Sequence, residues 1–313
     1  MKKQKTLLII CAVGFLFGCL KVYYSIENSK YNTEMNRLQE TGELNITITA
    51  DIEQKTIKRN GHSIHYFMSG NKTGETIIFL HSAFGDHRCF DRQIDCFSQN
   101  FRVITVDMLG HGLTGAGKSS GNISETYFHI ADILAQEEIE NVHIVGVSLG
   151  SLLAQDFALK YPEKILSLTA LGGYNINKEQ KEVAKAQQKE MFKWLFKMIF
   201  SMDTFRRYTA SVTLIDKIEQ AHFYESAKLF ARKSFTVMTG LDKLIANRSV
   251  KHNYPLLILS GEKDTELAVK SAKQWHIDDP ESQMHIIENA GHCANMDNSA
   301  AFNEILMAFL NNL

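Results

Sequence analysis

Short apolar runs alternate with amphipathic stretches from about residue 54 to the C-terminus. Several of these runs are almost continuously apolar, which is typical of strands buried on both faces of a parallel sheet. Strands are predicted at Thr56–Lys58, His62–Met68, Thr76–His81, Arg102–Asp107, Val142–Val147, Leu166–Leu171, Leu256–Ser260 and Gln283–Ile287. Helices are predicted around Phe90–Ser98, Ser124–Glu138, Ser151–Lys160, Ala268–Trp275 and Ser299–Leu310. This alternation predicts an α/β fold with a mostly parallel, eight-stranded sheet and helices on both faces.

One long segment, residues 175–251, interrupts the alternation after the sixth predicted strand. It carries helical patterning with many Lys, Glu and Gln and has no strand-like run. Because it is far longer than an ordinary loop, we expect a helical cap over the C-terminal edge of the sheet, where open α/β folds bind ligands. The main domain is then expected to comprise residues 46–174 and 252–313.

The N-terminal residues 1–20 have the pattern of a signal peptide or membrane anchor. Three lysines among the first five residues precede an uncharged run of 14 residues, Leu7–Leu20. As a helix this run covers about 21 Å, less than a bilayer core of about 30 Å. A basic start and a short apolar run indicate export. The sequence around Cys19, Leu-Phe-Gly-Cys, resembles a bacterial lipobox, in which this cysteine is diacylated.

Residues 21–45 are polar and have no sustained apolar stripe, so they are expected to form a tether, with part of it helical. On the lipoprotein reading, the chain is held at the membrane by a lipid on Cys19. On the alternative reading, the leader remains as an uncleaved signal anchor. Both readings place the body of the protein outside the cytoplasm.

Composition excludes several classes of protein. A net charge of -1 and a pI near 6.9 provide no basic field for binding nucleic acid. Five cysteines in 313 residues are too few for a disulfide scaffold. No CxxC or HExxH spacing occurs, so the sequence predicts no metal site.

The clearest chemical signal is Gly146-Val147-Ser148-Leu149-Gly150, a GxSxG motif between a predicted strand and a predicted helix. This is the context in which Ser148 would be a nucleophile on a sharp turn. A serine hydroxyl needs a base, and the base needs an orienting acid. Asp264 and His292 follow later strands at spacings of 116 and 28 residues, in the order such a turn requires. Glu262 is the rival acid.

The loop His81-Ser82-Ala83-Phe84-Gly85 follows a predicted strand and resembles an HGxxG-type oxyanion loop, with Ser82 where glycine is usual. The backbone N–H groups of Ala83 and Leu149 are the expected oxyanion donors. The segment from Asp107 to Thr114 resembles a DxxGxGxS turn, and we expect this turn to shape the floor of the site.

Together these motifs resemble the α/β-hydrolase superfamily, in particular its branch of serine esterases, C–C bond hydrolases and aminopeptidase-like enzymes. The resemblance covers about residue 54 to the C-terminus. It implies a Ser–His–Asp triad and no metal or organic cofactor. A serine in the GxSxG turn distinguishes the chain from the related haloalkane dehalogenases and epoxide hydrolases, which have aspartate there.

The expected activity is hydrolysis of small-molecule carboxylic esters with a small or medium apolar acyl group. Phe84, Trp194 and Phe196 are candidate substrate contacts, and simple packing of the cap helix is the other interpretation of the two cap residues. An aminopeptidase, a lactonase, a thioesterase and a C–C bond hydrolase remain alternatives on the same triad. A signalling receptor that retains the triad and binds a small ligand is the non-enzymatic alternative.

Overall fold

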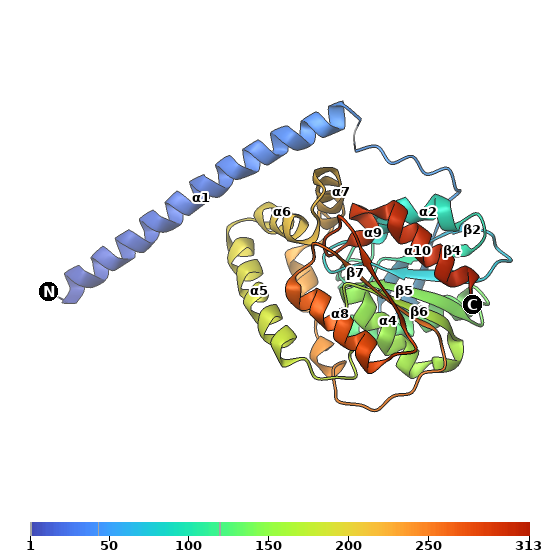
Figure 1. Ribbon diagram of the computed structural model, residues 1–313. Helices are drawn as coiled ribbons and strands as arrows, with labels where there is room; N and C mark the ends of the chain where they lie inside the picture. Colours follow the sequence, from blue (N-terminus) through green and yellow to red (C-terminus); the bar gives the residue numbers. More distant parts are fainter. Residues whose placement is uncertain (1, 43, 119) are drawn as a thin grey trace.

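The computed structural model describes residues 2–42, 44–118 and 120–313. Its centre is one sheet in the order β1-β2-β4-β3-β5-β6-β7-β8 (Figure 1). β2 runs antiparallel to β1 and β4, and all other neighbours are parallel. The strands are β1 Glu53–Arg59, β2 His62–Gly70, β3 Thr76–Leu80, β4 Arg102–Val106, β5 Val142–Val147, β6 Ile165–Leu171, β7 Leu256–Gly261 and β8 Gln283–Ile287. The predicted mostly parallel, eight-stranded sheet is confirmed.

Helices cover both faces of this sheet. One face packs against α3 (Thr126–Gln136), α4 (Leu149–Lys160) and α8 (Glu266–Asp278). The other face packs against α2 (Asp91–Phe97), α9 (Ala294–Asp297) and α10 (Ser299–Asn311). Strand β5 is buried along its whole length because successive side chains enter the two different cores. This explains why the central strands carry almost unbroken apolar sequences.

The cap lies between β6 and β7 and is helical, as predicted for this segment. It contains α5 (Lys181–Phe200), α6 (Met202–Thr213) and α7 (Lys217–Ala227), followed by short 3-10 turns at Arg232–Thr236 and Leu241–Lys243. Polar contacts join α7 to the main domain. Arg92 Nη2 lies 2.7 Å from Glu219 Oε1, and Arg88 Nη2 donates to the carbonyl of Glu225 at 3.1 Å. The cap is therefore fixed to the start of α2.

The N-terminal helix α1 (Lys2–Glu40) is longer than the pattern predicted, because it continues through most of the expected tether. Its C-terminal half packs on the cap. The ring of Tyr31 lies 4.9 Å from that of Tyr224, and Arg207 donates to the carbonyl of Glu27 at 2.9 Å. Leu38 is only 4% exposed. Residues 21–40 are therefore a docked helix, which the weak apolar pattern did not reveal.

The N-terminal end of α1 extends away from the domain (Figure 1). Cys19 lies on this helix as an exposed free thiol. Among the described residues, no helix combines the length and the apolar character needed to cross a bilayer.

Docking of α1 can be tested by placing a charge on its buried side. Leu38→Glu should release the C-terminal half of α1, because an unpaired carboxylate is costly in an apolar contact. Native-state trypsin cleavage after Lys30 should then become severalfold faster. Ile26→Glu, on the exposed side of the same helix, should leave the cleavage rate unchanged. Equal cleavage rates in wild type and Leu38→Glu would contradict the docked position.

Candidate active site

Ser148 occupies the sharp turn between β5 and α4, with φ 53° and ψ -113°. A non-glycine residue in this region is strained, typically by about 1–3 kcal/mol. The turn is held from both sides. Ser148 N–H donates to the carbonyl of Leu171 at the end of β6 (2.7 Å), and its own carbonyl accepts from Ser151 N–H (3.0 Å).

Two glycines allow the close approach that this turn requires. A Cβ on Gly146 would lie 2.4 Å from the backbone of Gly150, and a Cβ on Gly150 would lie 2.1 Å from the carbonyl oxygen of Leu80. Both distances are far inside van der Waals contact. Both glycines of the GxSxG motif are therefore required by close backbone contacts. One contact joins the turn to α4, and the other joins α4 to the end of β3.

The structure brings Ser148, His292 and Asp264 into one hydrogen-bonded chain. Ser148 Oγ lies 2.7 Å from His292 Nε2, and His292 Nδ1 lies 2.7 Å from Asp264 Oδ2. The three residues follow β5, β8 and β7, whose carboxyl ends share one edge of the sheet. The rival acid Glu262 instead lies at the surface and accepts from Asn289 N–H at 3.1 Å. The acid in contact with the histidine is therefore Asp264.

This arrangement fixes the histidine tautomer. A carboxylate can only accept, so His292 Nδ1 carries the proton and Nε2 is free to accept from the Ser148 hydroxyl. Burial by itself lowers the pKa of His292, but the charge of Asp264 and the hydrogen bond to it outweigh burial. The pKa of His292 is therefore raised above its ordinary value of about 6.5.

The predicted oxyanion loop, residues 81–85, lies beside the Ser148 turn. It follows β3, which pairs with β5 so that Leu80 is opposite Gly146. The contact of Gly150 with Leu80 places the first turn of α4, which includes Leu149, directly against this loop. Ala83 and Leu149 thus lie on neighbouring segments next to Ser148, and their role as oxyanion donors stays a prediction.

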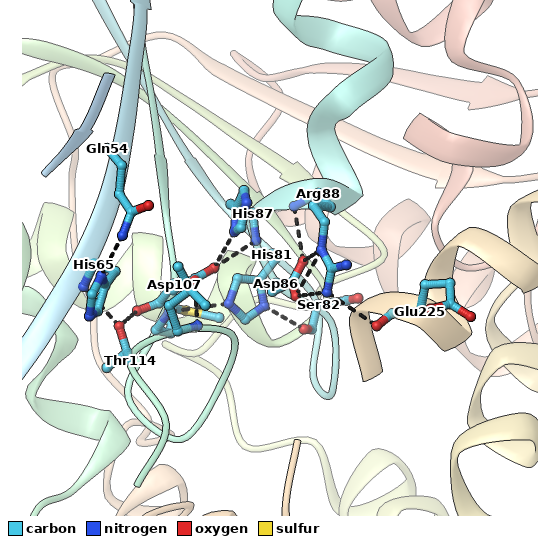
Figure 2. A network of polar contacts seen from close by, with 12 residues as sticks. Gln54, His65, His81, Ser82, Asp86, His87, Arg88, Asp107, Thr114 and Glu225 are labelled. Atoms are coloured by element: carbon cyan, nitrogen blue, oxygen red, sulfur yellow. Dashed lines mark hydrogen bonds and ion pairs between the residues drawn. The ribbon is translucent and has the colours of Figure 1, made fainter. Parts of the chain in front are cut away.

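A polar network holds the loop in position (Figure 2). His81 Nδ1 lies 2.8 Å from the carbonyl of Ser82, and His81 Nε2 accepts from Met108 N–H at 3.2 Å. Burial lowers the pKa of His81, which keeps the ring neutral. His81 therefore braces the loop against the turn that starts at Asp107, and it has both ring nitrogens engaged.

The same network contains three potential metal ligands, Asp86, His87 and Asp107, with one ligand atom each within 4.8 Å of the others. Their oxygens already have protein donors. Asp86 forms an ion pair with Arg88 at 2.6 Å, and Asp107 accepts from His87 Nδ1 at 2.8 Å and from Leu113 N–H at 2.7 Å. The positive charge of Arg88 next to Asp86 disfavours a bound cation. These three residues therefore fit a structural hydrogen-bond network better than a cation site.

Phe84, the residue after Ala83, is clamped by aromatic rings of the cap. Its backbone has a φ of 71°, a left-handed conformation that is unfavourable for a bulky residue. Its ring makes edge-on contacts, with centroid distances of 4.9 to 5.0 Å, to Trp194, Phe205 and Phe230. Phe235 lies 6.1 Å away. The cap thus contacts the oxyanion loop directly through Phe84.

Sequence reasoning found only part of this aromatic cluster. Phe84 and Trp194 were named as candidates, whereas Phe205, Phe230 and Phe235 were missed because they belong to no motif and come together only in the folded cap. Phe196 stays a prediction as a substrate contact and lies outside this cluster. Its side chain is 48% exposed and packs on Phe200, because residues two apart on a helix face opposite sides and Trp194 takes the inner one.

Comparison with known proteins agrees with this fold. Residues 75–214 match a family model described as alpha/beta hydrolase fold. A 2-hydroxy-6-oxononadienedioate/2-hydroxy-6-oxononatrienedioate hydrolase of Cupriavidus pinatubonensis is 26% identical over 266 residues, which cover 77% of this chain and 90% of that protein. A protein of the same name in Paraburkholderia phymatum is 23% identical over 278 residues, which cover 79% of this chain and 90% of that protein.

Solved structures show the same architecture. Carboxylesterase CesB from Bacillus subtilis aligns with a TM-score of 0.65 at 17% identity, over 89% of this chain and 97% of that one. The protein therefore has the α/β-hydrolase fold. The family model and the curated relatives are consistent with this fold.

The close approach of Gly150 to β3 predicts a specific sensitivity. Gly150→Ala should lower the free energy of unfolding by about 1–3 kcal/mol, because the added methyl group meets backbone that can only move as a unit. Chemical denaturation measures this loss. Gly14→Ala, where a Cβ meets nothing within 4 Å, is the matched control and should not destabilise the protein. An equal free energy in wild type and Gly150→Ala would contradict the described turn.

Proposed function

We propose that the protein is a serine hydrolase that cleaves carboxylic esters with a small or medium apolar acyl group through a covalent acyl-enzyme. The single observation that carries this proposal is the continuous chain from Ser148 Oγ through His292 to Asp264, with 2.7 Å at each link. Such a chain can remove a proton from a hydroxyl as that hydroxyl attacks a carbonyl carbon.

In the first half of the proposed reaction, Ser148 Oγ attacks the ester carbonyl and His292 Nε2 takes its proton. Asp264 keeps the imidazole in the reactive tautomer and stabilises the imidazolium that forms. The carbonyl oxygen, now negatively charged, accepts hydrogen bonds from the N–H groups of Ala83 and Leu149. His292 then gives its proton to the departing alcohol oxygen as the C–O bond breaks.

In the second half, water takes the place of the alcohol. His292 removes a proton from that water as its oxygen attacks the acyl carbon, and the same two N–H groups again hold the oxyanion. Collapse of this intermediate returns the proton to Ser148 Oγ and releases the carboxylic acid. Every proton is accounted for by His292, so this proposed cycle requires no cofactor.

The aromatic cluster supports the choice of an apolar acyl group. Phe84 lies next to the proposed oxyanion donor Ala83, and Trp194 and Phe230 pack against its ring. Phe84 is buried and adjoins Ala83 in the chain, so the cluster would place apolar side chains near the carbonyl of a substrate bound at Ser148. The carboxylesterase neighbour fits the same interpretation. The curated relatives named as hydrolases of 2-hydroxy-6-oxo dienedioates make C–C bond hydrolysis on the same triad the second candidate.

We further propose that the chain is held at a membrane outside the cytoplasm by its N-terminal segment. The support is the sequence, with three lysines before the uncharged residues 7–20 and a lipobox-like Cys19. Mass analysis of the N-terminus of the native protein tests this, since lipidation at Cys19 and retention of the leader give different masses.

Removal of the nucleophile is the first test of the ester hydrolysis. Ser148→Ala should reduce turnover of p-nitrophenyl acetate and butyrate by about 10⁶-fold, since removing the serine disables the whole triad. The control variant is Glu262→Gln, which removes a nearby carboxylate that is not hydrogen-bonded to His292. It should retain full activity. A dienedioate substrate assayed alongside separates the two candidate reactions. Undiminished ester turnover in a folded Ser148→Ala variant would contradict the proposal.

The raised pKa of His292 predicts the pH dependence. Protonated His292 cannot accept the serine proton, so kcat/KM should rise with pH through a midpoint above about 6.5. Asp264→Asn removes the charge that raises this pKa. Its midpoint should therefore move to lower pH, while the limiting rate falls by about 10⁴-fold. A pH profile of Asp264→Asn with an unshifted midpoint would show that Asp264 does not act on His292.

A further inference from the structure

The outward side of cap helix α5 is unusually apolar. Five large apolar side chains on its C-terminal half are between 48% and 69% exposed: Met191, Phe192, Leu195, Phe196 and Ile199. On the opposite side of the helix, Trp194 and Met198 pack against the core. Figure 1 shows α5 at the outer edge of the domain, and these five side chains stay about half exposed or more among the described residues. A contiguous exposed apolar face of this kind indicates an interaction surface.

This face is continuous with the apolar part of α1. The ring of Phe200 lies 4.9 Å from Phe196 on its own helix, 5.0 Å from Phe17 and 5.5 Å from Tyr24. Beyond this contact, Phe15 and Leu16 are exposed on α1. The end of α5 therefore touches α1 where the uncharged run of residues 7–20 ends.

Two lysines lie near this contact between α5 and α1. Lys21 Nζ lies 5.4 Å from the ring centroid of Phe17, and Lys197 Nζ lies 5.8 Å from that of Tyr24. Helix α5 carries five lysines and two glutamates, a formal charge of 5 − 2 = +3, in a chain whose total is -1. Apolar side chains with flanking lysines are the pattern of a helix that lies in the interface of an anionic membrane.

We propose that the outward face of α5, centred on Phe192, Leu195 and Ile199, lies on the surface of an anionic phospholipid bilayer. The inference rests on the membrane attachment proposed above and does not depend on ester hydrolysis. If the leader is retained, residues 7–20 enter the bilayer and Phe17 brings Phe200 to its surface. If Cys19 carries the lipid instead, Tyr24 is still only about 7.5 Å along α1 from the lipid. The ring of Phe200 lies 5.5 Å from that of Tyr24.

Helix α5 also contacts the segment next to the candidate active site. Trp194 projects from the inner side of the same helix onto Phe84, beside the proposed oxyanion donors. Helix α5 would thus separate the bilayer surface from the acyl side of the site. Esters that partition into the bilayer would then reach the enzyme at the helix that covers the catalytic loop.

A tryptophan placed on this face reports its contact with lipid. The full-length chain is mixed with vesicles of phosphatidylcholine and phosphatidylglycerol, made with and without brominated acyl chains. Phe192→Trp adds an indole at the most exposed position of the face, and Ile277→Trp on α8 is the control, since both original side chains are 69% exposed. The emission of wild type, from Trp194 and Trp275, is subtracted from each.

An interfacial helix buries its apolar face about 5–10 Å deep, so bromine should quench the indole added at 192 severalfold more than the one at 277. Equal quenching at both positions, with the chain bound to vesicles, would overturn the proposal and leave the membrane attachment intact. A chain that does not bind vesicles at all would overturn both. A blue-shifted emission at 192 without vesicles, unaffected by bromine, would mean that a second copy covers the face.

Discussion

The contact between Gly150 and the carbonyl of Leu80 is the constraint on which the site depends. It brings α4 against the end of β3 so closely that no side chain fits between them. Three features follow from this approach. The chain must turn sharply at Ser148, the first residues of α4 lie beside the oxyanion loop, and the serine hydroxyl points to the sheet edge where β7 and β8 deliver Asp264 and His292.

Two strained residues lie on the segments that this contact brings together. Ser148 and Phe84 both have positive φ values, and each is over-determined by its surroundings. The end of β6 holds Ser148 through a hydrogen bond from its N–H, whereas three aromatic rings of the cap hold Phe84. The core therefore fixes the proposed nucleophile, and the cap fixes the loop of the proposed oxyanion donor Ala83. A change in the cap's position would act on the loop through Phe84 before it reached Ser148.

Much of the fold could be predicted from the sequence because the central strands are buried on both faces. The bounds of β5 and β8 match the predicted runs, since an apolar run flanked by turn residues leaves little freedom. The Ser, Asp and His positions followed from the loops after three strands. The choice between Asp264 and Glu262 stayed open, because it depends on how one short loop directs two neighbouring side chains.

The features that the sequence did not reveal depend on tertiary contacts. The docked part of α1 is polar and has a weak apolar stripe, so only its contacts with α6 and α7 show that residues 21–40 pack on the cap. The rings around Phe84 come from separate cap segments with no shared motif. Trp194 and Phe196 are two apart on α5, so only Trp194 faces Phe84, and the direction in which the helix turns its sides is set by its packing on the domain.

The central claim is that Ser148 is a nucleophile activated by His292, and covalent labelling tests it most directly. A fluorophosphonate should modify the native protein at one site, and peptide mass analysis should place the adduct on Ser148. His292→Ala, which removes the base but keeps the hydroxyl, should label far more slowly. An adduct on another residue, or equal labelling rates in wild type and His292→Ala, would contradict the account.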